Sequence, residues 1–234
     1  VHIDQYRSYK DSIRPGHAEY GFFKKYGQYA DWVGAGRASG RETASRVAGG
    51  AVAKAVLDQM GIDVIAYTIA SHGIKIKEPV TYEFAKENYR KNEINCPDLA
   101  LAEEMKKDIL KVKADGETAG GVIECIARGV PAGLGEPVFD KMNALLAHAV
   151  CSIGAIKGIE FGAGFGVADM LGAESNDEAY VDKATGKVRF KTNHAGGILG
   201  GITNGEDIRF RCAVKPTPTV SVPQATVNVE KMED

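Results

Sequence analysis

The sequence lacks the features that mark membrane proteins, secreted proteins and general nucleic-acid binders. No apolar run approaches the roughly 18–20 residues that a membrane span needs, and no signal-peptide pattern opens the chain. A formal net charge of −2 argues against binding through a broad basic field, so any anion site must be local. We therefore expect a cytoplasmic protein with small-molecule partners, and neither nucleic acid nor a membrane among its partners.

Cysteine is scarce and widely spaced. The four cysteines are Cys96, Cys125, Cys151 and Cys212, and none of them forms a C-x-x-C pair. This spacing suggests neither a zinc site nor a disulfide framework, and lone cysteines are usually small buried hydrophobes. We expect no metal site and a reducing, cytosolic compartment.

The common nucleotide-binding and nucleophile motifs are also missing. Gly34 and Gly36 are followed by Gly40 instead of a glycine at 39, and no predicted strand precedes them, so the dinucleotide fingerprint is absent. The chain contains neither a G-x-x-x-x-G-K-[ST] phosphate loop nor a G-x-S-x-G nucleophile elbow. No NADPH-binding motif is recognisable.

Glycine is abundant, and its placement is informative. Most of the 28 glycines gather at 34–40, 116–135, 154–166 and 196–205. The first group leads into a predicted helix at 41–60, whose small apolar residues recur at helical spacing and predict burial against another backbone. Arg37, Ser39 and Arg41 lie ahead of this helix, where free N–H groups and the helix dipole attract anions. A solvated basic loop before a core helix is the alternative interpretation.

The remaining pattern predicts a mixed α and β chain. A polar helical segment is expected at 82–92. A long polar loop is expected at 171–192, with a hairpin about Thr185-Gly186, and loops of this kind are often functional lids. Helices are also expected at 99–112 and, with Pro137 in its first turn and a buried face, at 136–153. Strands are expected at 63–70, 122–128, 155–161 and 208–214.

Basic and hydroxyl side chains lie on or beside the glycine-rich turns. The set suits a small, multiply anionic ligand in a glycine-lined pocket, and comprises Arg14, His17, Arg37, Ser39, Arg41, His194 and Lys215. Pro15-Gly16 predicts a tight turn between Arg14 and His17. In the segment 215–219 two prolines fix an extended backbone beside three side-chain donors that could hold a phosphate.

Six segments, taken in order, resemble the chorismate synthase family over nearly the whole chain. They are RPGHAE (14–19), KYG (25–27), GRASGRETASRVAGGAVAK (36–54), GVPAGLGEPVFDKMNALLAHAVCSIGAIKGIEFG (129–162), NHAGGILGGITNGEDI (193–208) and KPTPT (215–219). The resemblance implies an α+β fold, a β-α-β sandwich with helices such as 41–60 and 136–153 between antiparallel sheets. It also implies a homotetramer.

The resemblance further implies a carbon–oxygen lyase of aromatic amino acid biosynthesis. The family removes phosphate from 5-enolpyruvylshikimate 3-phosphate by an anti-1,4-elimination to give chorismate, the last common step of the shikimate pathway, and requires reduced FMN. Some members reduce the flavin themselves with NADPH, and others rely on an external flavin reductase. One phosphate and two carboxylates on the substrate explain a pocket rich in arginine, and a reduced flavin favours a protonated histidine near its ring.

Residue roles follow from the same resemblance. His17 matches the catalytic histidine thought to protonate reduced flavin, and Arg14 and Arg41 match arginines that hold substrate anions. The cofactor-binding residues implied are Arg37, Ala38, Ser39, Asn143, Ala144, Gly200, Lys215, Pro216, Thr217, Pro218 and Thr219. The last five are expected to hold the ribityl-phosphate end of the flavin.

Some positions depart from the family pattern. Val33 replaces an arginine, Ala35 replaces a glycine, and Glu19 replaces the aspartate of the RPGHAD motif. The family's N-terminal glycine–serine–histidine motif and its C-terminal arginine–x–aspartate–proline motif are absent from 1–234. We therefore expect a single domain, incomplete at both ends, that forms the central part of such an enzyme. The alternatives are a non-catalytic flavin- or anion-binding module of the same fold and a poorly folded chain that aggregates.

Overall fold

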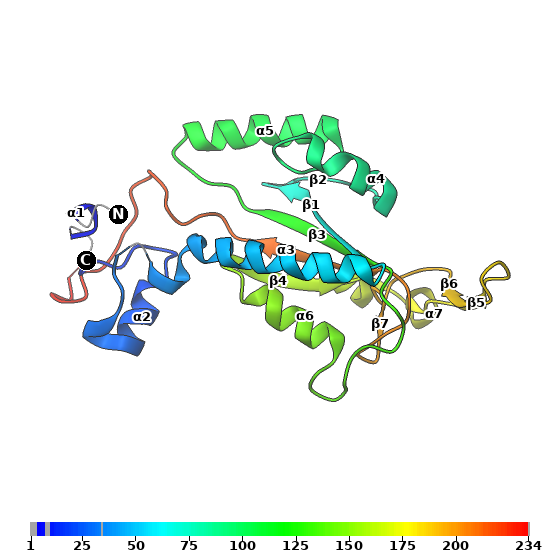
Figure 1. The fold of residues 1–234 in the computed structure, drawn as a ribbon. Helices are drawn as coiled ribbons and strands as arrows, with labels where there is room; N and C mark the ends of the chain where they lie inside the picture. Colours follow the sequence, from blue (N-terminus) through cyan, green and yellow to red (C-terminus); the bar gives the residue numbers. More distant parts are fainter. Residues whose placement is uncertain (1–3, 8–9, 34, 234) are drawn as a thin grey trace.

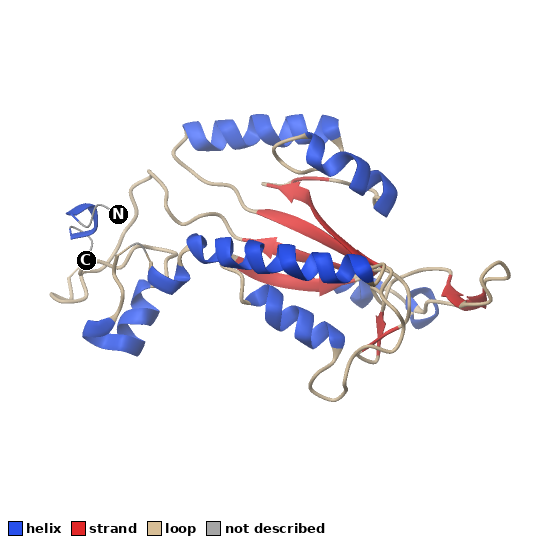
Figure 2. Cartoon of the chain, viewed as in Figure 1, coloured by secondary structure: helices blue, strands red, loops and turns tan. Residues whose placement is uncertain are grey.

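The computed structural model describes residues 4–7, 10–33 and 35–233, so Gly34 of the first glycine group lies outside the described residues. A five-stranded antiparallel sheet forms its centre (Figures 1 and 2). In spatial order its strands are β2 (Ile74–Lys75), β1 (Asp63–Ser71), β3 (Gly121–Arg128), β9 (Ile208–Val214) and β4 (Ile156–Phe161). The four strands predicted from the sequence are confirmed, and so is the α+β class.

Two helices lie over one face and the β2 edge of this sheet (Figure 1). They are α4 (Tyr82–Asn88), followed by a 3₁₀ turn at Tyr89–Lys91, and α5 (Leu99–Ala114). Thr81 and Asp98 cap them by accepting hydrogen bonds from Phe84 N and Leu101 N. Tyr82 of α4 and Tyr89 of the 3₁₀ turn pack on β1 and β3, and Met105 of α5 is fully buried near β2. The predicted helices at 82–92 and 99–112 are confirmed.

The opposite face packs against α6 (Met142–Cys151). Phe210 and Ile208 of β9 form the centre of this second cluster, against Met142, Leu146 and Val150. The helix predicted at 136–153 is confirmed from Met142 onward, but its predicted start at 136 is wrong, and its core-facing side is only partly buried.

Two hydrogen bonds explain why α6 begins at Met142 and not at 136. Glu136 N donates to Asp140 O at 2.8 Å, and Met142 N donates to Gly201 O at 2.8 Å. Gly135 has φ +124°, and a Cβ there would lie 2.2 Å from Gly201 O, so the backbone is pressed against the 200–201 turn. These contacts hold residues 136–141 in a turn that helical hydrogen bonding would break.

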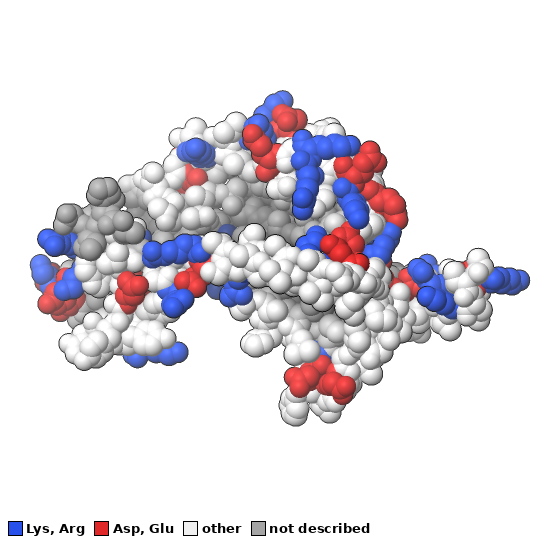
Figure 3. Space-filling view, viewed as in Figure 1, with Lys and Arg blue, Asp and Glu red and all other residues white. Residues whose placement is uncertain are grey.

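The long helix α3 (Thr43–Gln59) follows a 3₁₀ turn at Gly40–Glu42 and stands in front of the sheet (Figure 1). None of its residues is buried, and Val47 and Val52 are 72% and 70% exposed. Its outward surface forms a largely uncharged band (Figure 3). The predicted burial of this helix is therefore wrong for this chain, because no second layer of described residues covers it. An apolar surface on all sides is typical of a helix buried between two layers.

The remaining elements are short. The predicted hairpin is confirmed as β5 (Ala179–Val181) paired with β6 (Val188–Phe190), and a second hairpin pairs β7 (Ile198–Leu199) with β8 (Ile202–Thr203). The other helical pieces are α1 (Asp4–Arg7), α2 (Glu19–Tyr26), α7 (Gly172–Ser175) and 3₁₀ turns at Gly27–Tyr29, Gly36–Ala38 and Gly164–Asp169. Among the described residues no helix has the length and apolar character to cross a membrane.

Candidate functional site

A cavity of about 770 Å³ lies where four separate segments meet. These segments are the turn at 14–18, the loop at 35–43, the turn at 151–157 between α6 and β4, and the extended segment at 215–219. A volume of this size is within the usual range for small-molecule and cofactor sites. Nine residues that the sequence assigns to the site line it: Arg14, His17, Arg37, Ala38, Ser39, Lys215, Thr217, Pro218 and Thr219.

His17 is partly buried in this cavity and contacts the 215–219 segment. Its Nε2 atom lies 3.3 Å from Thr219 Oγ1. Burial, and then the nearby positive charge of Arg14, lower the pKa of His17 below its ordinary value of 6.5, with Lys215 acting in the same direction and Glu19 opposing. His17 is therefore neutral at neutral pH in the free pocket, and an anionic ligand would raise its pKa.

Hydrogen bonds hold the segments of the cavity together. Lys215 N donates to Ala155 O at 2.9 Å, and Lys215 Nζ donates to Gly16 O at 2.6 Å. Gly16 has φ +73°, and a Cβ there would lie 2.8 Å from Pro218 Cβ. Only glycine permits this close approach without displacing the proline. The turn that carries His17 is thus fixed against the 215–219 segment.

Arg14 is held by Glu19 at the rim of the cavity. The guanidinium of Arg14 forms an ion pair with the Glu19 carboxylate, and Arg14 N donates to Glu19 Oε2 at 2.7 Å. Glu19 is the residue that departs from the family aspartate, and its longer side chain still reaches Arg14. The pair fixes the arginine's position and reduces the positive charge that it offers to a ligand.

The loop at 35–43 supplies exposed donors on the opposite wall. Arg37 has a side chain that is 89% exposed and lies 3.3 Å from Glu42. Ser39 Oγ accepts a hydrogen bond from Arg41 N at 3.3 Å, and Thr43 Oγ1 donates to Gly40 O at 2.6 Å. These local bonds stabilise the turn that leads into α3.

Five assigned residues do not line this cavity. Arg41 Nη2 donates to Val33 O at 3.3 Å, and Pro216 packs close to Gly120. Asn143, Ala144 and Gly200 lie together at the start of α6, whereas the cavity adjoins the end of that helix. The Oδ1 atom of Asn143 is buried and has no hydrogen-bond partner among the described residues. His194 is also remote from the cavity and lies beside Asp177.

The sequence reasoning missed two parts of the cavity. Arg46 lines it from the first turns of α3, and residues 151–157 form one of its walls. The 151–157 stretch belongs to a segment that resembles the family, yet no residue type in it signalled a ligand. A turn between a helix and a strand carries such information only once the fold brings it beside other segments.

The fold is α+β, and basic side chains, among them Arg14, Arg37 and Lys215, line its cavity. The comparisons with known proteins give the family. The family model described as chorismate synthase matches residues 1–234. The chain therefore belongs to the chorismate synthase family.

Individual relatives agree with this assignment. A chorismate synthase of Acetivibrio thermocellus is 68% identical over 233 residues, which are 100% of this chain and 59% of the relative. One of Methanocella arvoryzae is 48% identical, over 96% of this chain and 59% of the relative. A crystal structure of chorismate synthase superposes with a TM-score of 0.80 at 35% identity, covering 86% of this chain and 64% of that chain. The chain thus spans less than two thirds of these proteins.

Proposed function

We propose that this chain forms the central part of a chorismate synthase, a lyase that removes phosphate from 5-enolpyruvylshikimate 3-phosphate in the presence of reduced FMN. The observation that carries the proposal is the convergence of His17, Arg37 and Lys215 on one cavity from segments far apart in the sequence. A ligand with one phosphate and two carboxylates suits such a cationic, partly enclosed wall.

The described residues fit a bound flavin in two respects. Asn143, outside the cavity of its own protomer, has a buried oxygen without a partner among the described residues, which suits an N–H donor of a ligand. The 215–219 segment places Lys215 and two threonines along the cavity, which suits a phosphate. When bound, reduced flavin supplies electron density to the substrate as its phosphate departs.

His17 would hold the proton that this chemistry needs. Burial and Arg14 lower its pKa in the free pocket, which favours the neutral ring before the ligand arrives. A bound anion favours the imidazolium form, and Thr219 Oγ1 keeps the ring in place through Nε2. Binding of an anion would therefore be coupled to uptake of a proton by His17.

The quaternary structure and cellular setting follow as parts of the same proposal. A homotetramer would cover the exposed valines of α3 and could bring the Asn143 cluster of one protomer to the cavity of another. The described cysteines are free, which accords with a reducing, cytoplasmic setting.

Reduced flavin would come from an external reductase or from NADPH. Oxidation of NADPH by the chain with FMN alone distinguishes these routes.

Anaerobic turnover tests the proposal. The chain is mixed with reduced FMN and 5-enolpyruvylshikimate 3-phosphate, and phosphate release and chorismate absorbance are followed. His17→Ala should lower turnover far more than FMN affinity, whereas His72→Ala, in an exposed turn away from the cavity, should match the wild type. FMN binding without turnover would favour the non-catalytic module instead.

A further inference from the structure

Arg46 connects two walls of the cavity. Its Nη1 donates to Ser152 Oγ at 2.9 Å, and its Nη2 donates to Ser152 O at 2.8 Å, across 106 residues of sequence. We propose that Arg46 is a positioning residue, which holds the loop at 35–43 at a fixed distance from the wall at 151–157. The proposal rests on the function proposed above only in taking this cavity as the site of an anionic ligand.

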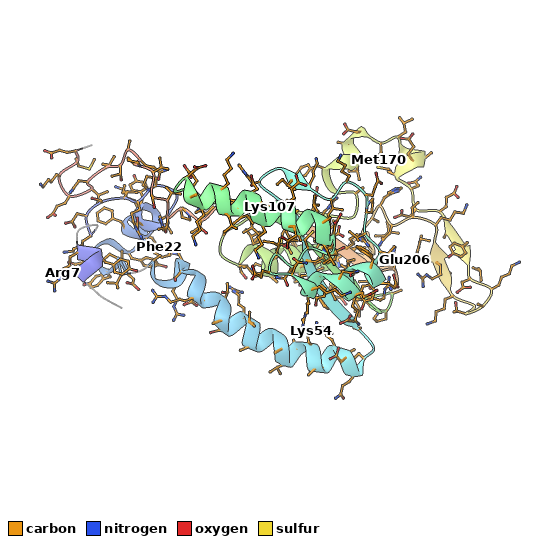
Figure 4. All side chains as sticks on the ribbon, turned by 90° about the horizontal axis from the view of Figure 1, so that it is seen from above. Arg7, Phe22, Lys54, Lys107, Met170 and Glu206 are labelled. Carbon is orange, nitrogen blue, oxygen red and sulfur yellow. The ribbon has the colours of Figure 1, made fainter. Side chains whose placement is uncertain are left out.

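The attachment of α3 depends on a few polar contacts. No residue of this helix is fully buried, and Leu57, near its end, packs against the second core cluster. At its far half Lys54 Nζ donates to Val64 O at 2.6 Å and pairs with Asp63 at 3.9 Å, and Figure 4 shows Lys54 directed from α3 toward the sheet. Arg46 makes the corresponding contact at the half that carries the cavity wall. Without it, the start of α3 would lose two hydrogen bonds to the wall at 151–157.

The acceptor on the other wall is suited to a cation. Ser152 follows the last residue of α6, and its carbonyl lies at the negative end of that helix dipole. Ser152 Oγ also donates to Ala149 O at 2.6 Å, so its hydroxyl is held in place to accept from Arg46. A guanidinium satisfies both oxygens at once, which a point charge such as lysine cannot do equally well.

The influence of Arg46 extends to His17 through the backbone. Three residues beyond Ser152, Ala155 O accepts from Lys215 N at 2.9 Å. Lys215 in turn donates through Nζ to Gly16 O at 2.6 Å, next to His17. These hydrogen bonds, with the short backbone link from Ser152 to Ala155, therefore join α3, the 151–157 turn, the 215–219 segment and the His17 turn. Arg46 acts on the ligand through these segments.

Hydrogen exchange on the free chain tests the connection without any ligand. Arg46→Met should speed amide exchange in peptides covering 151–157 and 213–219. The matched control is Lys54→Met, which removes the other anchor of α3 and should speed exchange near 52–66 while leaving 213–219 unchanged. Unaltered exchange at 213–219 in Arg46→Met would overturn the proposal, whatever its effect on thermal stability.

FMN affinity supplies the second measurement. Arg46→Met should weaken FMN about tenfold, as expected for the loss of hydrogen bonds from one charged donor. Arg46→Lys should recover part of this loss, and Lys54→Met should bind like the wild type. Weaker binding with unchanged exchange at 213–219 would make Arg46 a direct ligand contact and contradict the positioning role. If the wild type binds no FMN, the proposed function fails, while the exchange experiment still decides the role of Arg46.

Discussion

At the scale of single residues, the loop before α3 shows a conflict between side chain and backbone. Ala35 has φ +65° and Gly36 has φ +47°, both in the left-handed region. Ala35 occupies a position where family members usually carry glycine, so it tolerates strain that they avoid. At Gly36 an added Cβ would lie 2.8 Å from Asp31 Oδ2 and 3.0 Å from Asp31 Cβ. We therefore expect Gly36→Ala to destabilise the protein and Ala35→Gly to stabilise it.

Gly36→Ala should lower the free energy of unfolding by about 1–2 kcal/mol, because alanine is strained in this conformation and the aspartate must move. Ala35→Gly should raise it by about 0.5 kcal/mol, since relief of strain exceeds the extra flexibility of glycine in the unfolded chain. Urea unfolding at one temperature measures both values. A larger loss for Ala35→Gly than for Gly36→Ala would contradict the described backbone of this loop.

His17 should make anion binding depend on pH. Its pKa in the free pocket is lowered from 6.5, and a bound anion raises it, so binding takes up a proton. Affinity for FMN should therefore fall as the pH rises from about 5.5 to about 8. The flavin phosphate titrates with both proteins, so the pH dependence measured for His17→Gln is subtracted to isolate the contribution of His17. His72→Gln should keep the wild-type dependence, and an identical dependence in His17→Gln would refute this role.

At the scale of elements, a buried ion pair connects strands of the main sheet. Glu124 of β3 is 7% exposed, accepts a hydrogen bond from Tyr67 of β1, and pairs with Arg209 of β9 at 3.0 Å. Arg209 also donates to Val80 O through both terminal nitrogens, at 3.3 and 3.2 Å. Burial and the neighbouring carboxylate raise the pKa of Tyr67, so its hydroxyl remains a donor. Loss of Arg209 would leave Glu124 buried without a positive partner, and loss of Glu124 would leave the partly buried Arg209 without its carboxylate.

Glu124→Leu or Arg209→Leu should each lower the free energy of unfolding by about 3 kcal/mol, because each leaves an uncompensated partner. The double variant should lose clearly less than the sum of the two. Removing the exposed pair of Glu87 and Lys91, 3.3 Å apart, is the matched control and should cost less than about 0.5 kcal/mol. A double-mutant cycle in urea measures the coupling, and simple additivity would show that the pair does not act as a unit.

The elements also show what local sequence can and cannot predict. The strands at 63–70 and 208–214 were predictable, because both are rich in β-branched and apolar residues and both are largely covered. The start of α6 was not, since the remote 200–201 turn supplies one of the bonds that keep 136–141 out of a helix. The hairpin at 198–203 was missed for a similar reason: its glycines fit a turn, but its two-residue strands have no detectable period.

At the scale of the whole molecule, the exposed surface of α3 predicts self-association. Val52 and Val56 are 70% and 60% exposed on a helix without buried residues. Val52→Lys/Val56→Lys should shift the chain toward smaller species in sedimentation velocity while the far-ultraviolet circular dichroism stays unchanged. Leu110→Lys, at a residue 56% exposed on α5, is the control and should leave the distribution as it was. A wild-type chain that sediments as a monomer at all concentrations would contradict this prediction.

The candidate site was predictable only in part, and the reason lies in long-range packing. His17, Ser39 and Lys215 could be assigned because each belongs to a motif that resembles the family. Arg46 also lies in such a segment, but its role could not be assigned because it depends on Ser152, which lies far away in the sequence. The separation of Asn143 from the cavity was also invisible, since the sequence does not tell which end of a helix faces a pocket. The sequence shows which residue types are present in each motif, whereas only the fold shows which of these residues lie together.

Titration with FMN, in the absence and presence of 5-enolpyruvylshikimate 3-phosphate, tests the central claim most directly. The wild-type chain should quench flavin fluorescence saturably, and Lys215→Gln should weaken binding about tenfold, because it removes a charge that faces the ligand and the bond to Gly16. Lys107→Gln, on α5 and away from the cavity, should bind like the wild type. Equal binding by Lys215→Gln and the wild type, or no binding by either, would contradict the assignment of this cavity as the flavin site.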